Sequence, residues 1–307
     1  MKISVIICTY NRAALLEECL QSLVEQTLAL PEFEVVVVDN HSTDQTAAIA
    51  QQFEAIFPHF RYVFEATQGL SHARNRGFRE ASAAWVLFLD DDAKAAKNML
   101  ERAVQTIENQ PFQLFGGVAL PWYKYPKPYW FKDKYGTINQ LNYHRVSKLK
   151  SNEYAIGGIM VIYKPLLEKY GGFDTQLGMS GAKIAYNEEV ELQLRLRRDG
   201  IAIGHDPALL MYHLVAPYKM KVDWFFNAAF AQGRDNLSSK NISTHPLNLL
   251  LIAAVAFGMM LIHLIIYTPC LLQRHYYVQN WLIDVFRKVA KRVGTVYTGL
   301  LHKKDIP

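Results

Sequence analysis

The chain has 307 residues, half of them hydrophobic, and this length suits one domain of about 200 to 250 residues plus an appendage. The formal net charge of +5 lies entirely in residues 273–307, which hold seven Lys or Arg and two Asp or Glu. The rest of the chain is neutral overall and lacks the basic excess of nucleic-acid-binding proteins, which argues against that class of partner.

The segment 1–90 alternates between short apolar runs and helical periodicity. The predicted strands are residues 3–8, 33–38, 61–64 and 85–89, and each of the first three leads into a helix. The sequence Ser42-Thr43-Asp44-Gln45 fits a capping box for the second helix, which would run to about Phe57. This alternation predicts a parallel, doubly wound α/β sheet that binds its ligands at the carboxyl ends of the strands. The residues expected at that edge are Thr9, Asn11, Asp39, Gly69 and Asp90.

Two features bear on the cellular compartment. The N-terminal run MKISVIIC is too short for a signal peptide and is better interpreted as a strand. Three cysteines, Cys8, Cys19 and Cys270, are odd in number and lack the spacing of a metal site. This usage favours a reducing compartment, with Cys8 and Cys19 as small core residues.

Three adjacent carboxylates, Asp90, Asp91 and Asp92, follow the apolar run 85–89. Their mutual repulsion costs about a pKa unit or more unless positive charge offsets it, and a hard divalent cation prefers such oxygen ligands. Because alternate residues of a strand share a face, Asp90 and Asp92 should point together and Asp91 away. We interpret Asp90 and Asp92 as a metal clamp for a diphosphate, since neither a dinucleotide fingerprint nor a P-loop motif is present. A solvated acidic turn that caps the next helix is the alternative.

The segment 121–143 is rich in Trp and Tyr with interleaved Lys and Pro, and it breaks both helical and strand periodicity. We interpret it as an irregular flap whose aromatic faces suit sugar rings and whose basic residues suit phosphate. The alternative is that these aromatic residues cover a second hydrophobic cluster. The next predicted strand, 155–163, should be buried, and Gly157 and Gly158 would let a donor or acceptor approach its backbone closely.

A second acidic site begins the helix predicted from Glu188 to about Arg198, with Asn187 as its cap and Gly200 at its end. The helix dipole stabilises carboxylates in the first turn by about 0.3 to 1 kcal/mol, which keeps them ionised and able to accept a proton. One interpretation is therefore a general base. The other is an ordinary acidic first turn, which is common for the same electrostatic reason.

Several segments occur in an order that is informative as a set: SVIICTYNR, VVVVDNHSTDQT, GLSHARNRG, FLDDDA, GGFD and NEEVELQLRLRRDG. Over about residues 1–215 they resemble the motif set of the family 2 glycosyltransferases, which have the GT-A fold. The resemblance implies an enzyme that takes a sugar from a nucleoside-diphosphate sugar, with UDP as the expected carrier, and inverts its anomeric centre. It also implies Mn²⁺ or Mg²⁺ as cofactor.

The resemblance further implies roles for residues at the strand ends. Asp92 is implied as a metal ligand together with Asp90, and His213 resembles the histidine that completes the metal shell in some relatives. For His213, a hydrogen-bonded loop residue is the alternative. The residues implied in donor binding are Thr9, Asn11 and Asp39 at the base and ribose, Arg74 near the nucleotide, and Asp90 and Asp91 at the donor.

The implied general base departs from the family pattern in one residue type. The usual Glu-Asp-x-Asp motif corresponds here to Glu188-Glu189-Val190-Glu191, which places Glu189 at the position of the base. Glu189 is longer than Asp by one methylene group. Glu188 and Glu191 are the alternatives for the same role.

The C-terminal segment 246–307 combines an apolar helix with a basic tail. Residues 249–266 reach the length of a membrane span, and the following basic residues alternate with apolar ones in a pattern suited to an anionic membrane surface. A single crossing would place the basic tail opposite the nucleotide-sugar domain, against the positive-inside tendency. We therefore favour a helix that enters or lies in the inner leaflet, which leaves both parts cytoplasmic. A buried helix of a soluble domain is the alternative.

These observations predict a GT-A type α/β fold, a doubly wound and mostly parallel sheet flanked by helices, followed by a hydrophobic helix and a basic amphipathic tail. The expected divisions are 1–120 for nucleotide-sugar binding, 121–245 for acceptor binding and the base, and 246–307 for membrane association. The expected function is metal-dependent glycosyl transfer to a lipid-linked or polymeric glycan at the cytoplasmic face of the membrane, in cell-surface polysaccharide synthesis. The competing hypotheses are a sugar nucleotidyltransferase and a non-catalytic sugar-binding scaffold.

Overall fold

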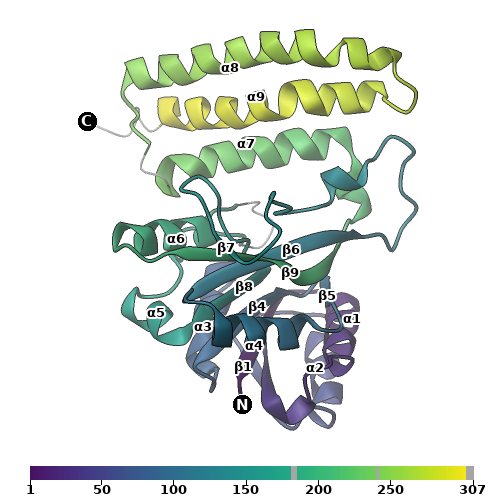
Figure 1. The fold of residues 1–307 in the computed structure, drawn as a ribbon, viewed down its shortest axis with the longest axis vertical. Helices are drawn as coiled ribbons and strands as arrows, with labels where there is room; N and C mark the ends of the chain where they lie inside the picture. The colour runs from purple at the N-terminus through teal and green to yellow at the C-terminus, as the bar shows by residue number, and fades with distance from the viewer. Residues whose placement is uncertain (181–184, 240–241, 302–307) are drawn as a thin grey trace. The chain divides into compact units, whose positions relative to one another are not determined.

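The computed structural model describes residues 1–180, 185–239 and 242–301 (Figure 1). The chain divides into two compact units. The first, here called the sheet unit, comprises Met1–Trp122, Asp133–Gly181 and Glu188–Leu214. The second, the helical unit, comprises Tyr123–Lys132, Ala182–Asn187 and Val215–Pro307. The expected boundary at residue 246 falls inside the helical unit, because the helix before it packs within that unit.

The N-terminal part of the sheet unit alternates strand and helix, as predicted. The elements are β1 (Ile3–Thr9), α1 (Ala13–Val24), β2 (Phe33–Asp39), α2 (Thr46–Glu54), β3 (Phe60–Phe64), α3 (Leu70–Glu80) and β4 (Trp85–Asp90). Strand β1 pairs in parallel with β2 and β4, and β2 pairs in parallel with β3. The carboxyl ends of these strands therefore lie at one edge of the sheet.

The rest of the sheet unit extends this sheet with strands of both directions. Its elements are β5 (Ala93–Ala95), α4 (Met99–Asn109), β6 (Leu114–Trp122), β7 (Ser147–Lys148), β8 (Ile159–Tyr163), α5 (Lys164–Lys169), α6 (Glu188–Arg198) and β9 (Ile203–Leu214). The strand order is β3-β2-β1-β4-β8-β6-β9-β5, with β7 also on β9. Strand β8 is antiparallel to β4 and β6, whereas β6 and β9 are parallel. The predicted mostly parallel, doubly wound sheet is thus confirmed.

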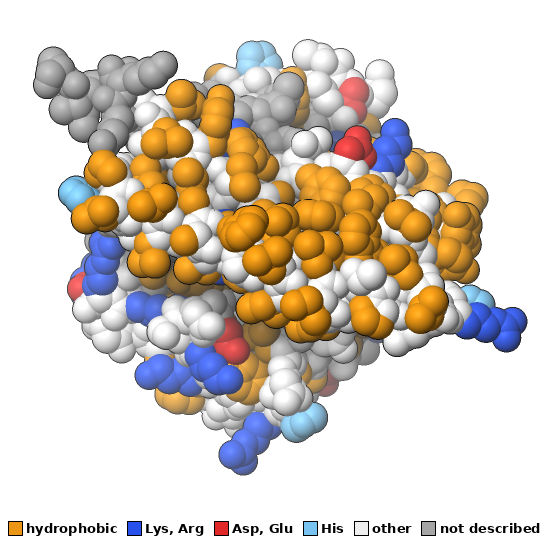
Figure 2. All heavy atoms as spheres, turned by 90° about the horizontal axis from the view of Figure 1, so that it is seen from above, with side chains coloured by type: hydrophobic (Ala, Val, Ile, Leu, Met, Phe, Trp, Pro, Cys, Tyr) orange, Lys and Arg blue, Asp and Glu red, His pale blue; other side chains and the backbone are white. Residues whose placement is uncertain are grey.

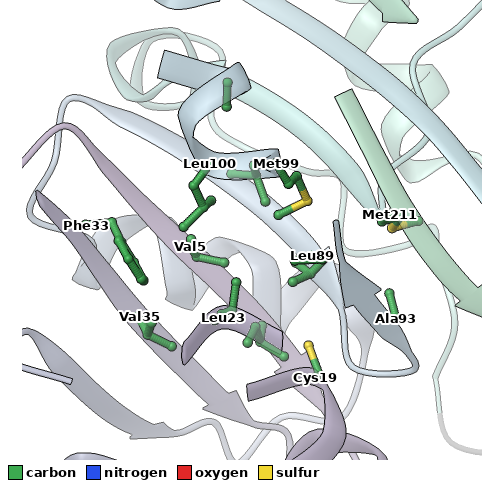
Figure 3. Close-up of a cluster of buried hydrophobic side chains, with 14 of the residues drawn as sticks. Val5, Cys19, Leu23, Phe33, Val35, Leu89, Ala93, Met99, Leu100 and Met211 are labelled. Carbon is green, nitrogen blue, oxygen red and sulfur yellow. The ribbon is translucent and has the colours of Figure 1, made fainter. Parts of the chain in front are cut away.

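Both faces of the sheet are covered, which explains why its strands are apolar at successive positions. In β1, Val5 and Ile7 join the cluster beneath α1 and α4, whereas Ile6 joins the cluster on the opposite face with Phe78. Figure 3 shows the first of these clusters, with Cys19 buried in it. The sequence of a strand that is buried on both faces is a continuous hydrophobic run and does not alternate between apolar and polar residues.

Two local predictions were wrong. Helix α2 begins at Thr46 and ends at Glu54, with no side-chain cap from Gln45. The carboxylate of Asp44 accepts from the backbone N–H groups of Ala13 and Thr46, so this acid, and not a capping box, satisfies the start of the helix. Strand β8 begins at Ile159, four residues later than expected. The two glycines before it, Gly157 and Gly158, lie against the side chains of Arg74 and Asp90 and are not part of the strand.

The helical unit is built from α7 (Val222–Ser239), α8 (Pro246–Tyr267) and α9 (Val278–Leu301). Helix α9 packs against both of the others and lies between them (Figure 1). Its contact with α7 is close because both helices carry glycine there. A Cβ added at Gly233 would lie 1.7 Å from the carbonyl oxygen of Lys291, and one at Gly294 would lie 2.1 Å from that of Phe230.

Aromatic residues of the segment 121–143 take part in the same unit. Trp130 and Phe131 are buried, with ring centroids 6.4 and 6.1 Å from that of Phe225 on α7. Tyr125 and Tyr129 remain exposed. The buried pair therefore covers a hydrophobic cluster, which is the second of the two interpretations offered for this segment.

The glycine contact between α7 and α9 gives a test of the helical unit. We expect Gly294→Ala to lower the free energy of unfolding by about 1 to 3 kcal/mol, because the added methyl group forces the two backbones apart. Gly258→Ala on α8 is the matched control, since nothing lies within 4 Å of its Cβ, and it should stabilise by about 0.5 to 1 kcal/mol. Thermal unfolding followed by circular dichroism measures both, and equal effects would contradict the close packing.

Candidate active site

The strand register brings the predicted polar residues to one edge of the sheet. Thr9 is aligned with Asp39 across β1 and β2, and Cys8 is aligned with Asp90 across β1 and β4. Gly69, the residue before α3, has a φ of 145° that L side chains rarely adopt. The strand ends thus hold carboxylates, a hydroxyl and a helix start within a small region, as the alternating pattern indicated.

Asp90, Asp92 and His213 form a candidate metal centre in the sheet unit. Nε2 of His213 lies 3.2 Å from Oδ1 of Asp92 and 3.8 Å from Oδ2 of Asp90, and the three candidate ligand atoms all lie within 4.8 Å of one another. His213 reaches the centre because β5 pairs with β9, which aligns it with Ala93 directly after the acids. Two ligands of an octahedral ion with bonds of about 2.1 Å are about 3 Å apart. The donor set and its spacing therefore fit Mn²⁺ or Mg²⁺.

Asp91 and Asp92 lie in the turn that follows β4, where the expected strand alternation does not apply, and Asp91 is outside the set of candidate ligands. Its Oδ1 accepts from a guanidinium nitrogen of Arg12 at 2.9 Å, and the same nitrogen lies 3.4 Å from Oδ2 of Asp92. Burial raises the pKa of Asp91 to about 6, although the charge of Arg12 opposes the rise. Buried Asp91 and partly exposed Arg12 thus form an ion pair beside the candidate metal ligands.

Arg74 joins the metal centre to the second acidic site. Its side chain is 4% exposed, and its guanidinium lies 2.5 Å from Oε1 of Glu188 and 3.8 Å from Oδ1 of Asp90. The same guanidinium lies over the rings of Phe88 and Phe173 at 5.9 and 5.4 Å from their centroids. The start of α6 and the end of β4 are therefore held together by one buried cation.

Gly157 and Gly158 make room for this cation and its partner. A Cβ at Gly157 would lie 2.5 Å from a guanidinium nitrogen of Arg74, and one at Gly158 would lie 2.0 Å from Oδ2 of Asp90. We expected these glycines to admit a ligand to a strand backbone. The structure shows that they admit the side chains of Arg74 and Asp90, and that the strand starts only after them.

The carboxylates of α6 have three different environments. Glu188 is 5% exposed and paired with Arg74. Glu191 accepts from the guanidinium of Arg195 through both carboxylate oxygens, at Nε–Oε distances of 2.8 and 2.9 Å. Glu189 lies between them in sequence. Burial, and secondly the charge of Glu188, raise the pKa of Glu189 to about 8, while Arg74 opposes the rise. Of the three, Glu189 therefore has the proton affinity that a general base near neutral pH needs.

The other residues implied in donor binding stabilise loops at the same edge. Thr9 is buried at the end of β1. Oδ1 of Asn11 accepts from the backbone N–H of Thr43 at 2.7 Å. The carboxylate of Asp39 accepts from the hydroxyl of Tyr62 at 2.6 Å and the N–H of Ser42 at 2.8 Å. These bonds fix the loops after β1 and β2, and the direct roles of the three residues toward a donor remain predictions.

Two contributors to the site were missed from the sequence. Arg12 follows directly after Asn11 in TYNR, and the need of three adjacent acids for positive charge was the signal that could have identified it. The role of Gly158 toward Asp90 had no such signal. Their proximity depends on the antiparallel pairing of β4 with β8, which aligns Leu89 with Ile159.

Comparisons with known proteins agree with this geometry. The family model described as Glycosyl transferase family 2 matches residues 4–171. Glycosyltransferase AglE of Haloferax volcanii is 40% identical over 116 residues, which is 38% of each chain. A glucosyl-dolichyl phosphate glucuronosyltransferase of the same organism is 25% identical over 240 residues, covering 76% of this chain and 75% of that protein.

The solved structures show the same fold. A mannosyltransferase from Pyrobaculum calidifontis, solved with GDP-Man and Mn²⁺, matches 98% of this chain and 88% of its own, with a TM-score of 0.64 and 19% identity. The mixed sheet described above is thus that of a GT-A type transferase.

The contact between Gly158 and Asp90 predicts a metal-binding defect. We expect Gly158→Ala to weaken Mn²⁺ binding by about 10- to 100-fold, because the added methyl group would displace the carboxylate of Asp90, a candidate metal ligand. Titration calorimetry on the purified full chain measures the affinity. Gly258→Ala, which adds the same group in open space, should leave it unchanged. Normal Mn²⁺ affinity in folded Gly158→Ala would contradict the assignment of Asp90.

Proposed function

Because the chain belongs to glycosyl transferase family 2, we propose that it transfers a sugar from a nucleoside-diphosphate sugar to a hydroxyl group, with inversion at the anomeric carbon. The observation that carries this proposal is the position of Arg74, in contact with both Asp90 of the metal centre and Glu188 of α6. One side chain thereby links a site for diphosphate to a site for a base. A displacement reaction needs these two functions on opposite faces of the same sugar.

In the proposed reaction, Glu189 accepts the proton of the acceptor hydroxyl as that oxygen attacks the anomeric carbon. The bond from the anomeric carbon to the phosphate oxygen breaks, the new glycosidic bond forms, and the nucleoside diphosphate leaves with the bonding electron pair. Glu188 and Arg74 hold the first turn of α6 in place beside Glu189. Asp91 and Arg12 support the acids at the end of β4.

Asp90, Asp92 and His213 are the residues that would hold a divalent cation. When bound there, Mn²⁺ or Mg²⁺ would act as a Lewis acid and offset the negative charge that develops on the departing diphosphate. The solved mannosyltransferase with Mn²⁺ supports this cofactor class. We propose that Thr9, Asn11 and Asp39, at the ends of β1 and β2 and in the loop after β1, contact the base and ribose of the donor.

The family and the relatives support the donor and acceptor classes that we propose. A UDP-sugar is the expected donor, and GDP-Man in the solved mannosyltransferase makes a GDP-sugar the comparison to test. A lipid-linked or polymeric glycan is the proposed acceptor. The relative named for glucosyl-dolichyl phosphate supports a lipid-linked one. Synthesis of cell-surface glycans is the corresponding process.

We propose that the chain acts at the cytoplasmic face of the membrane, with the segment 246–307 in contact with lipid. The stretch Pro246–Leu272 is long and apolar enough to cross a membrane: an 18-residue window within it has a mean hydropathy of 2.8, and 11% of that window is buried. The cysteines and the nucleotide-sugar donor support the cytoplasmic side.

Metal-dependent donor binding is the first test. A nucleotide-sugar at 100 times its dissociation constant should stabilise the protein by about 2.7 kcal/mol when Mn²⁺ is present. Asp92→Asn should lose this stabilisation, because it removes a charged metal ligand. Thermal shift with a panel of UDP- and GDP-sugars, with and without Mn²⁺, measures both effects. A variant that binds donor normally with Mn²⁺ would overturn the metal centre.

The second test separates Glu189 from Glu188. We expect Glu189→Gln to lower kcat by about 10²- to 10⁴-fold and to keep donor binding. Because the base must be ionised and a bound cation favours its ionised form, kcat/KM of the unmodified chain should rise with pH and level off by about 8. Glu188→Gln removes the neighbouring negative charge, lowers the pKa of Glu189 and should shift this rise to lower pH. Loss of all turnover in Glu188→Gln, with full turnover in Glu189→Gln, would assign the base to Glu188.

A further inference from the structure

Helix α8 carries a continuous apolar face that no described residue covers. Figure 2, which looks onto this face, shows a broad band of hydrophobic side chains. The residues of α8 that expose more than half of their surface are Leu247, Leu250, Leu251, Phe257, Ile262, Ile265 and Ile266. They span the whole helix, which is about 33 Å long at 1.5 Å per residue. The stretch Pro246–Leu272 contains no Asp, Glu, Lys or Arg.

Three polar side chains of this stretch are hydrogen-bonded within the helical unit. Nδ1 of His263 lies 3.3 Å from the carbonyl oxygen of Val285 on α9, and the amide of Asn248 donates to the carbonyl of Ser243 at 2.7 Å. The indole N–H of Trp281 donates to Oγ1 of Thr268 at 3.2 Å. The exposed face of α8 therefore consists mainly of aliphatic and aromatic side chains, which are more stable in hydrocarbon than in water.

The neighbouring helix decides how α8 can meet a bilayer. Helix α9 runs antiparallel to α8, because its Gly299 lies beside Leu249 and its Val285 lies beside His263. Between these two contact points α9 carries a cluster of cations: Arg287, Lys288, Lys291 and Arg292. If α8 crossed the bilayer, these residues would occupy the same depth, and Lys and Arg are among the costliest residues to place at its centre.

We propose that α8 lies flat in the surface of a phospholipid bilayer, with its axis in the membrane plane and its exposed face among the acyl chains. In this orientation α9 and α7 remain on the aqueous side, where Arg287 keeps its position over the ring of Phe225 and Lys291 its bond to Gln232, and the cation cluster stays out of the hydrocarbon. The hydrocarbon then covers a face that water would otherwise solvate. This inference rests on the membrane association proposed above and is independent of glycosyl transfer.

Vesicle binding tests whether α8 is the contact surface. Full-length protein should float with vesicles of phosphatidylcholine and phosphatidylglycerol, and Ile262→Glu should weaken binding about tenfold or more, since one buried aliphatic side chain contributes that much. Ile56→Glu in the sheet unit is the matched control: it is 42% exposed, against 55% for Ile262, and should bind normally. Equal binding of the two variants would overturn the role of α8.

Depth measurement tests the orientation. The variants Leu250→Cys, Phe257→Cys and Ile265→Cys, each in a Cys270→Ser background, would carry a fluorophore whose quenching by shallow and deep nitroxide lipids reports depth. The Cys270→Ser parent measures labelling of the remaining cysteines. We expect one shared, shallow depth at all three positions. A deep Phe257 between two shallow ends would show a crossing helix and overturn the proposal while membrane association stands.

A second copy of the chain is the competing occupant of this face. Analytical ultracentrifugation in mild detergent, without lipid, should give a monomer for both the unmodified chain and Ile262→Glu. A dimer that Ile262→Glu dissociates, together with no vesicle binding, would overturn both the orientation and the membrane association. Glycosyl transfer measured with a soluble acceptor would be unaffected by any of these outcomes.

Discussion

The buried guanidinium of Arg74 is the interaction on which the candidate site depends. A charge that is removed from water is costly unless neighbouring charges and hydrogen-bonding groups compensate it. Arg74 has this compensation from Glu188 and, more distantly, from Asp90, and its faces lie against Phe88 and Phe173. Breaking such a buried pair by removing one partner costs about 3 to 5 kcal/mol. The pairing therefore strongly favours one relative position of β4 and α6.

The same charges set the chemistry of Glu189. Its carboxyl group is affected by burial and by Glu188, which favour the protonated form, and by Arg74, which favours the ionised form. Glu188 forms a buried ion pair with Arg74, and this makes it the poorer candidate for a base that must take up and release a proton. A cation bound by Asp90, Asp92 and His213 would add positive potential to this region and favour the ionised, reactive form of Glu189.

Patterns of short range predicted much of this arrangement. The alternation of strands and helices predicted the parallel half of the sheet. Asp90 and Asp92 share one candidate metal centre as expected, although β4 ends at Asp90 and the next two acids lie in a turn. The pairing of Arg74 with Glu188 joins residues 114 positions apart, and no local pattern contains it. The capping box failed because Asp44, inside the same four residues, bonds both Thr46 and the start of α1. Long-range pairing and competition among neighbouring acceptors are thus what the sequence alone left undetermined.

The C-terminal segment shows how tertiary packing changes the meaning of a hydrophobic run. By length and composition, α8 resembles a membrane span. A single span, however, would place the basic tail on the side of the membrane opposite the nucleotide-sugar domain, against the positive-inside tendency. The structure pairs α8 with α9 along its length, so that one side of the run already has a protein partner and only the other side needs hydrocarbon. Because one side of α8 packs against α9 and the other is exposed, the hydropathy of α8 alone does not predict its orientation relative to a membrane. The cations of α9 decide the orientation that we propose, because they would lie at the same depth as α8, and an axis parallel to the membrane keeps them out of the hydrocarbon.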